Sequence, residues 1–164
     1  MSNLFPKVLN SENLEPALQS YKNKNLKIVF TNGCFDLLHI GHVRYLEEAA
    51  SLGDVLIVGI NTDASVQKLK GPTRPIQNEN DRAEILASLK SVQHTILFGE
   101  ETPLELIQKI KPDVLVKGGD WAIPQIVGSD FVLKNGGKVL SLQFVDGKSR
   151  RRLIQKSQKY ILIS

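Results

Sequence analysis

Short apolar blocks alternate with amphipathic stretches along most of this chain, and this alternation is the strongest constraint on its fold. Five blocks have the composition of strands that are buried on both faces, at residues 28–30, 55–60, 95–98, 114–116 and 139–142. Segments with helical spacing lie between and after them, at residues 43–52, 81–89, 103–110, 124–134 and 150–163. The alternation predicts an α/β fold with a parallel five-stranded sheet and helices on both faces.

A doubly wound, Rossmann-like sheet of this kind binds its ligands beyond the carboxyl ends of the strands. No repeat, low-complexity segment or linker divides the chain of 164 residues, so we expect one globular domain over residues 26–164. Residues 1–25 are expected to form a helical extension, with its helix around residues 11–22. The segments that follow each strand are therefore where functional side chains should lie.

The charge of the chain is concentrated near its C-terminal end. The chain has 21 Lys+Arg against 17 Asp+Glu, for a formal net charge of +4. Six of these cations have no acidic residue among them: Lys148, Arg150, Arg151, Arg152, Lys156 and Lys159. Without these six the rest of the chain is slightly acidic, which argues against a protein that coats nucleic acid.

Cysteine content and hydropathy indicate a cytoplasmic protein. Cys34 is the only cysteine, which excludes a disulfide framework and a cysteine-based zinc cluster. No apolar run approaches the roughly 20 residues that a membrane span needs. The first residues also lack a basic region followed by an apolar core, so we expect neither secretion nor membrane insertion.

The segment after the first predicted strand contains two of the three histidines. His39 and His42 flank Gly41 at the start of a predicted helix, where backbone N–H groups and the helix dipole favour an anion. The missing side chain of Gly41 allows a phosphate or nucleoside to approach the backbone. The simpler alternative is that His39 caps the helix and His42 is an ordinary helix residue. Two histidines around a glycine directly after a strand favour the functional interpretation.

Several common ligand sites are not indicated. The chain has neither a His-Glu-x-x-His helix nor a cysteine cluster, so metal ligation by the two histidines is not expected. A Walker A loop and a Gly-x-Gly-x-x-Gly fingerprint are also absent from the sequence, which argues against the usual P-loop and dinucleotide sites. Any phosphate cradle must therefore be of another kind.

The segment from Thr31 to His42, with its His-Ile-Gly-His signature, resembles the nucleotidyltransferase superfamily. Four further segments resemble the adenylyltransferase domain of bacterial ADP-heptose synthase: Val58–Asp63, Lys70–Pro75, Lys117–Trp121 and Asn135–Val139. The similarity extends over residues 26–154. In many bacteria that domain is fused to a sugar kinase, for which this chain is too short, so the resemblance implies a stand-alone form and a separate kinase.

The resemblance implies transfer of AMP from ATP to a heptose 1-phosphate, giving ADP-heptose and pyrophosphate for a lipopolysaccharide core or surface glycan. A glycerol-3-phosphate cytidylyltransferase is the nearest alternative within the superfamily. That family has an arginine, linked to cytosine, where this chain has Phe144. The sequence thus favours adenine. The resemblance also implies Mg²⁺ with ATP and a homo-oligomer, and no partner among nucleic acids or membranes is expected.

The resemblance, together with the chemistry of the side chains that follow the strands, assigns roles to residues in three groups. The expected catalytic residues are His39, His42, Lys70 and Asp36, with Lys70 on a flexible loop that could close over the phosphates. The expected nucleotide-binding residues are Thr31, Asn32, Gly33, Phe35, Gly41, Lys117, Gly119, Asp120, Ser149, Arg150 and Arg151. The expected acceptor-binding residues are Asn61, Asp63, Arg74, Arg82 and Trp121.

Several of these residues have a simpler structural alternative. Lys70 could be a solvated loop lysine, and Asp36 a helix cap. Asn61 and Asp63 could form an Asx turn. Arg82 could pair with an acidic residue on its own helix face, and Trp121 could pack into the core.

The C-terminal segment departs from the family pattern. The pattern Gly-x-Ser-Thr-Thr-x-Ile-Ile is here Gly147-Lys148-Ser149-Arg150-Arg151-Arg152-Leu153-Ile154. We expect Ser149 to remain a helix cap and phosphate donor, with Arg150 and Arg151 replacing the lost hydroxyl contacts by charge. Alternatively these arginines point into solvent, and the chain is a non-catalytic nucleotide-binding or interaction module.

Overall fold

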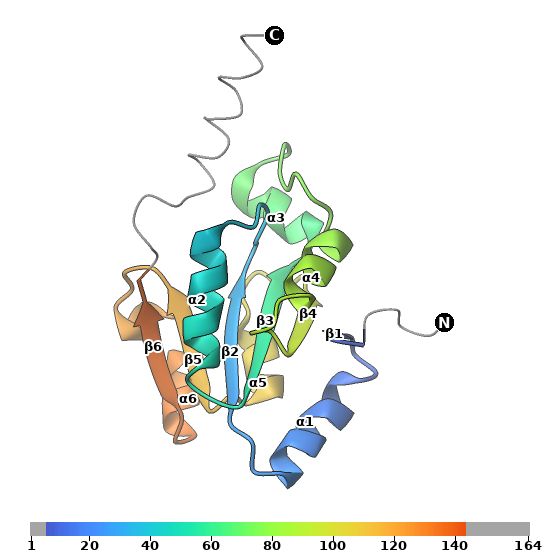
Figure 1. The fold of residues 1–164 in the computed structure, drawn as a ribbon. Coiled ribbons are helices and arrows are strands. Elements are labelled where there is room, and N and C mark those ends of the chain that lie inside the picture. Colours follow the sequence, from blue (N-terminus) through green and yellow to red (C-terminus); the bar gives the residue numbers. More distant parts are fainter. Residues whose placement is uncertain (1–5, 144–164) are drawn as a thin grey trace, which may run out of the picture.

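The computed structural model describes residues 6–143, which form one parallel six-stranded sheet with helices on both faces (Figure 1). The strand order is β1-β4-β3-β2-β5-β6. The strands are β1 (Val8–Leu9), β2 (Ile28–Gly33), β3 (Val55–Asn61), β4 (His94–Phe98), β5 (Val114–Gly118) and β6 (Lys138–Leu142). The predicted doubly wound, Rossmann-like α/β fold is confirmed, with one more strand, β1, than the five expected.

The helices are α1 (Leu14–Asn23), α2 (Ile40–Ala50), α3 (Asp63–Lys70), α4 (Glu79–Ala87), α5 (Leu104–Ile110) and α6 (Ser129–Lys134). A short 3₁₀ helix, η1 (Ile123–Gln125), precedes α6. None of the helices within residues 6–143 is long and apolar enough to cross a membrane.

One predicted helix differs from the structure, one observed helix was not predicted, and the predicted helix 150–163 lies outside the described residues. The segment 124–134 is not one helix, because Gly128, at a φ of 86°, separates η1 from α6. A Cβ at Gly128 would lie 2.7 Å from Ile107 Cδ1, so this close approach to α5 requires glycine. Helix α3 was not predicted at all. Its first turn is capped by the Thr62 hydroxyl, which accepts a hydrogen bond from Ser65 N.

The core consists of two apolar clusters, one on each face of the sheet. One cluster joins α1, α5 and α6 to side chains such as Phe30, Ile57 and Leu115. The other joins α2 and α4 to the alternate residues of the same strands, including Val58 and Val116. Successive strand residues point to opposite faces, so burial on both sides explains the continuous apolar blocks of the sequence.

The N-terminal segment belongs to the same sheet and core. Strand β1 pairs with β4 in parallel, and Leu14 and Leu18 of α1 are buried in the first cluster. The Tyr21 hydroxyl forms a short hydrogen bond with His94 Nε2, while His94 Nδ1 lies 3.2 Å from the carbonyl oxygen of Lys7. Because a carbonyl only accepts, Nδ1 carries the hydrogen and Nε2 accepts from Tyr21. The expected leading helix is therefore present as α1, is preceded by strand β1, and packs against the rest of the domain.

Candidate active site

The topology places the switch point of the sheet, where a doubly wound fold forms its ligand crevice, between β2 and β5. After β2 the chain crosses to β3, whereas after β5 it crosses to β6 on the other side, so the winding direction reverses between these neighbours. Strand β2 pairs with β3 over residues 28–33, but its pairing with β5 covers only Val29 with Val114 and Phe30 with Leu115. The pairing of these two strands therefore ends before their carboxyl ends, which lead into the loops before α2 and after β5.

The two histidines lie at the amino end of α2, next to this crevice. His39 is the N-cap residue and His42 is in the first turn, with ring centroids 3.8 Å apart and an interplanar angle of 28°. The backbone N–H of His39 donates to His42 Nδ1 at 3.4 Å. That contact makes Nε2 the N–H donor of the neutral His42 ring. The structure thus brings the pair together at a helix N-terminus, an environment that favours an anion.

Phe35 and Gly33 support this histidine pair. The buried Phe35 ring contacts the His42 ring edge to face, with centroids 5.3 Å apart. Phe35 has a φ of 45°, the left-handed region that non-glycine residues rarely adopt. A Cβ at Gly33 would lie 3.0 Å from Phe35 Cε2, so the glycine makes room for the ring. Strain at Phe35 and the absent side chain at Gly33 both serve to place His42.

Thr31 and Tyr45 fasten α2 to β2. The Thr31 hydroxyl is fully buried and lies 2.6 Å from the Tyr45 hydroxyl. Burial raises the pKa of Tyr45 to about 12, so this phenol stays protonated at any physiological pH. Asn32 is half-buried on β2 opposite Gly59, and Gly41 is buried in the first turn of α2. Thr31 is therefore placed to hold the helix rather than to face the crevice.

Asp36 joins the histidine loop to the segment after α3. Its carboxylate is nearly fully buried, and Oδ1 accepts hydrogen bonds from Ile76 N at 2.7 Å and Gln77 N at 3.2 Å. Its Oδ2 forms an ion pair with the Arg74 guanidinium. Arg74 Nε is buried and has no hydrogen-bond partner among the described residues. Arg74 is thus held in place by Asp36 and still has a donor to offer.

Asn61 and Asp63 lie at the carboxyl end of β3. Asn61, the last residue of β3, is buried and donates to the Ser65 hydroxyl at 3.0 Å, while its Oδ1 lies 3.8 Å from Cys34 Sγ. Asp63 begins α3, and its backbone N–H donates to Glu79 Oε2 at 2.6 Å. Its carboxylate forms an ion pair with Arg82, and the Asp63 side chain is partly exposed.

Lys70 is not in a flexible loop, contrary to the prediction. It is the last residue of α3 and is exposed, and the loop begins only at Gly71, which has a φ of 94°. Gly71 and Pro72 suggested a loop in the sequence, but they end helix α3 directly after Lys70. The segment that follows Lys70 contacts Asp36 through Arg74, Ile76 and Gln77.

The loop after β5 carries a half-exposed indole. The Trp121 side chain is 46% exposed, and its Nε1–H donates to the Gly118 carbonyl at 3.2 Å. Lys117 Nζ lies 5.7 Å from the Trp121 ring centroid, and burial lowers the pKa of Lys117. Gly119 has a φ of 112° and accepts a short hydrogen bond from the Ser141 hydroxyl, and Asp120 is exposed. Trp121 is thus a surface group, not a core residue.

Three predicted nucleotide contacts, Ser149, Arg150 and Arg151, lie outside the described residues, as does Phe144. Within residues 6–143 no group of three His, Cys, Asp or Glu side chains could hold a metal ion. Sequence reasoning did not assign Ser65, Ser141 or the backbone of Ile76 and Gln77, because their roles depend on partners distant in the sequence.

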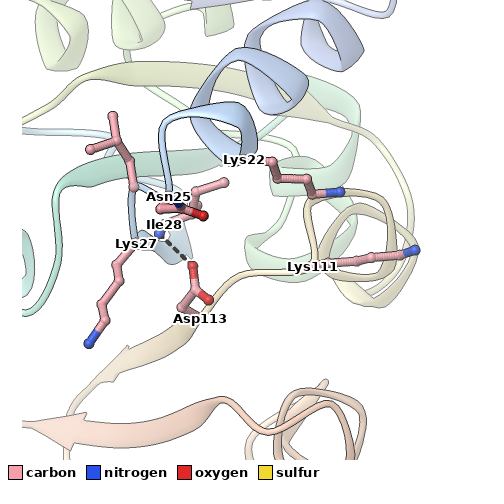
Figure 2. A pocket seen from close by; sticks show the side chains of 7 residues that line it. Lys22, Asn25, Lys27, Ile28, Lys111 and Asp113 are labelled. Atoms are coloured by element: carbon pink, nitrogen blue, oxygen red, sulfur yellow. Dashed lines mark hydrogen bonds between the residues drawn. The ribbon is translucent and has the colours of Figure 1, made fainter.

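A hollow of about 350 Å³ lies at the opposite end of the central strands, by the amino ends of β2 and β5 (Figure 2). It is lined by residues between α1 and β2 and between α5 and β5, including Lys22, Lys111 and Asp113. The Asp113 carboxylate already accepts a hydrogen bond from Ile28 N at 2.8 Å, and Lys22 and Lys111 lie at helix C-termini. Because those ends attract cations, the lysines are explained as local helix partners.

Comparison with known proteins decides the family. The cytidylyltransferase-like family model matches residues 30–164. The chain belongs to the cytidylyltransferase-like family. This nucleotidyltransferase is 51% identical over 150 residues to the bifunctional protein HldE of Citrifermentans bemidjiense, covering 92% of this chain and 31% of that protein. It is 52% identical over 158 residues to HldE of Aliarcobacter butzleri, covering 96% of this chain and 32% of that protein.

This member of the cytidylyltransferase-like family spans about a third of the length of the curated relatives it matches. Among solved structures, it resembles a lipopolysaccharide core biosynthesis protein from Thermoplasma volcanium with a TM-score of 0.58 and 31% identity, over 73% of this chain and 97% of that one. A pantoate-beta-alanine ligase from Francisella tularensis shares the fold, with a TM-score of 0.54 and 18% identity over 83% of this chain and 66% of that one. The resemblance indicated by the motifs is confirmed.

Proposed function

We propose that this nucleotidyltransferase transfers AMP from ATP to a heptose 1-phosphate, giving ADP-heptose and pyrophosphate. The observation that carries the proposal is the stacked His39–His42 pair at the start of α2, beside the crevice between β2 and β5. The similarity to HldE over 92% of this chain supports a heptose acceptor in lipopolysaccharide or surface-glycan synthesis.

The proposed reaction requires charge neutralisation more than proton transfer. An oxygen of the sugar phosphate attacks the α-phosphorus of ATP, a new P–O bond forms, and the bond to the β-phosphate oxygen breaks to release pyrophosphate. The second pKa of a phosphate ester is about 6, so the attacking group is already ionised near neutral pH. Its negative charge must approach a triphosphate, and this makes fixed donors the main catalytic device.

The chain offers such donors on the nucleotide side of the crevice. The Nε2–H of His42, together with His39 and the backbone N–H groups of the first turn of α2, would bind the triphosphate and the transition state at the α-phosphorus. Asn32, Gly33, Phe35 and Gly41 shape that loop, and Lys70 would approach the phosphates from the end of α3. Mg²⁺ would enter with ATP, bound by the phosphates and water, in keeping with the few carboxylates near the histidines.

Acceptor binding is proposed for the groups on the other loops. Arg74, held by Asp36 and with Nε unpaired, can donate to the sugar phosphate. Asn61 and Asp63 at the end of β3 offer polar groups to sugar hydroxyls. Trp121 and Asp120, with Lys117 and Gly119, would contact the nucleoside or sugar from the β5 side. Beyond the described residues, Ser149, Arg150 and Arg151 are proposed to contact the triphosphate.

A second candidate is cytidylyl transfer to glycerol 3-phosphate, favoured by the description of the matching family as cytidylyltransferase-like. The decisive test is pyrophosphate release from ATP or CTP with Mg²⁺, offering heptose 1-phosphate or glycerol 3-phosphate. We expect release with ATP and heptose 1-phosphate. Release with only CTP and glycerol 3-phosphate would establish the alternative, and none from any pair would support a non-catalytic module.

His42→Asn and Arg44→Lys give a matched pair of variants for this assay. Both residues lie in the first part of α2, but Arg44 is exposed and belongs to neither proposed binding group. Loss of a donor to the transition state should lower kcat by about 10² to 10³ in His42→Asn. Arg44→Lys should retain the wild-type rate.

We further propose a cytoplasmic homo-oligomer that works with a sugar kinase activity. The acceptor is a sugar 1-phosphate, and a reaction that phosphorylates a sugar must supply it. The HldE relatives are named as bifunctional, and about two thirds of their length lies outside the part that this chain matches. Co-purification from cells and mass measurement of the native complex would test these assignments.

A further inference from the structure

Arg82 is buried, and all three of its guanidinium nitrogens already donate to protein groups. It lies on α4, is 1% exposed, and each of its three nitrogens donates to a different segment. Nε donates to the Gln77 carbonyl at 3.0 Å, Nη1 to the Cys34 carbonyl at 2.6 Å, and Nη2 to Asp63 Oδ1 at 2.8 Å. The side chain therefore joins α4 to the histidine loop, to the start of α3 and to the segment after Gly71.

Gln77 is held from two sides through its backbone. Its carbonyl accepts from Arg82 and its N–H donates to Asp36, which also binds Ile76 N and Arg74. Asp36 and Arg82 are buried charges of opposite sign on either side of this segment. The position of Arg74 thus depends on Arg82 through Gln77 and Asp36.

We infer that Arg82 is a positioning residue that fixes Arg74 for the acceptor phosphate, instead of binding the acceptor itself. This inference rests on the proposed function. A planar guanidinium can hold three acceptors in fixed directions, whereas a lysine ammonium at the end of a flexible stem cannot match that geometry. A lysine at position 82 cannot keep all three of these hydrogen bonds to part-buried acceptors, so Arg82→Lys releases the segment 74–77.

The first test is a double-mutant cycle in the full chain. Arg82→Lys and Arg74→Lys are each expected to lower kcat/KM for the acceptor by about 10- to 100-fold, because a misplacement of about 1 Å has effects of this size. If Arg82 acts through Arg74, the double variant should match Arg74→Lys within about threefold. A double variant whose loss equals the product of the two single losses would overturn the inference.

The second test needs no activity. Amide hydrogen exchange in the substrate-free protein is expected to speed up at Ile76 and Gln77 in Arg82→Lys, by about tenfold or more, because hydrogen bonds that hold this segment are lost. The surface variant Arg44→Lys serves as the control and should exchange like the wild type. Unchanged exchange at residues 74–77 in a folded Arg82→Lys protein would overturn the inference.

Asp63→Asn covers the case in which Arg82→Lys does not fold. It keeps the size of a half-exposed side chain and its acceptor oxygen, but it replaces the ion pair with Arg82 by a weaker neutral hydrogen bond. Asp63→Asn should also speed up amide exchange at Ile76 and Gln77 and should also be non-additive with Arg74→Lys in kcat/KM, with smaller effects than Arg82→Lys. No change in either measurement would overturn the inference. A wild-type protein without pyrophosphate release would refute the proposed function alone, since the exchange measurement still tests Arg82.

Discussion

Replacing Asp36 by asparagine would break the link between the histidine loop and the segment that carries Arg74. The substitution keeps the shape of the side chain and its acceptor oxygen but removes the charge. Asp36 is 2% exposed, and its partners include two backbone N–H groups and one guanidinium. The hydrogen bonds from the two backbone N–H groups lose their charged acceptor. The neutral amide of the asparagine also leaves the Arg74 guanidinium without a counter-charge.

The expected loss of stability follows from the burial of this pair. Breaking a buried ion pair by removing one partner costs about 3 to 5 kcal/mol. The Arg74 side chain keeps 15% of its exposure and can regain some hydration, which places the expected cost at the lower end, about 3 kcal/mol. In a domain of this size, that corresponds to a fall in Tm of about 6 to 12 °C.

Urea unfolding of Asp36→Asn and Asp54→Asn would measure the effect. Asp54 also accepts a hydrogen bond from a backbone N–H, that of Lys27 at 2.8 Å. It is exposed, however, and lies at the opposite end of the strands, just before the amino end of β3. The control should lose no more than about 1 kcal/mol. If both variants lose the same small amount, and the acceptor KM of Asp36→Asn is unchanged, then Asp36 does not anchor the segment.

Three further outcomes test the fold. Leu18→Ala should cost about 3 kcal/mol in urea unfolding, because Leu18 is fully buried, whereas Gln19→Ala on the exposed side of α1 should cost little. Gly59→Ala should lower stability by about 1 to 3 kcal/mol by calorimetry, since the new Cβ would lie 2.8 Å from Phe30 Cζ. Burial lowers the pKa of His94 below its usual 6.5, so the unfolded chain protonates first. Stability should fall as pH drops through about 6.5, and His94→Gln should weaken this dependence in unfolding titrations.

The central strands could be predicted from sequence because burial on both faces leaves continuous apolar blocks. Strand β1 could not, since two residues, Val8 and Leu9, are too short for any period to show. Helix α3 was missed for a related reason. Only Ser65 and Val66 of its eight residues are buried, so it lacks the apolar stripe that marks a packed helix.

The candidate site likewise contains residues that the sequence could place and residues that it could not. His39, Gly41 and His42 are close in sequence, so their grouping at one helix end could be predicted from local spacing. Arg82 could not be placed, because one of its partners, the Cys34 carbonyl, is 48 residues away and carries no sequence signal. An arginine among charged residues looks like a solvent-facing helix residue, and only the tertiary structure shows that it is buried.

Strand β1 also bears on how copies of this protein meet one another. An open sheet edge presents unpaired N–H and C=O groups that can recruit a strand from another molecule. Here β1 covers part of the β4 edge, pairing Val8 with Thr95 and Leu9 with Ile96, and is itself only two residues long. Such a short outer strand offers little backbone for a further strand to pair with, so β1 works against edge-to-edge aggregation.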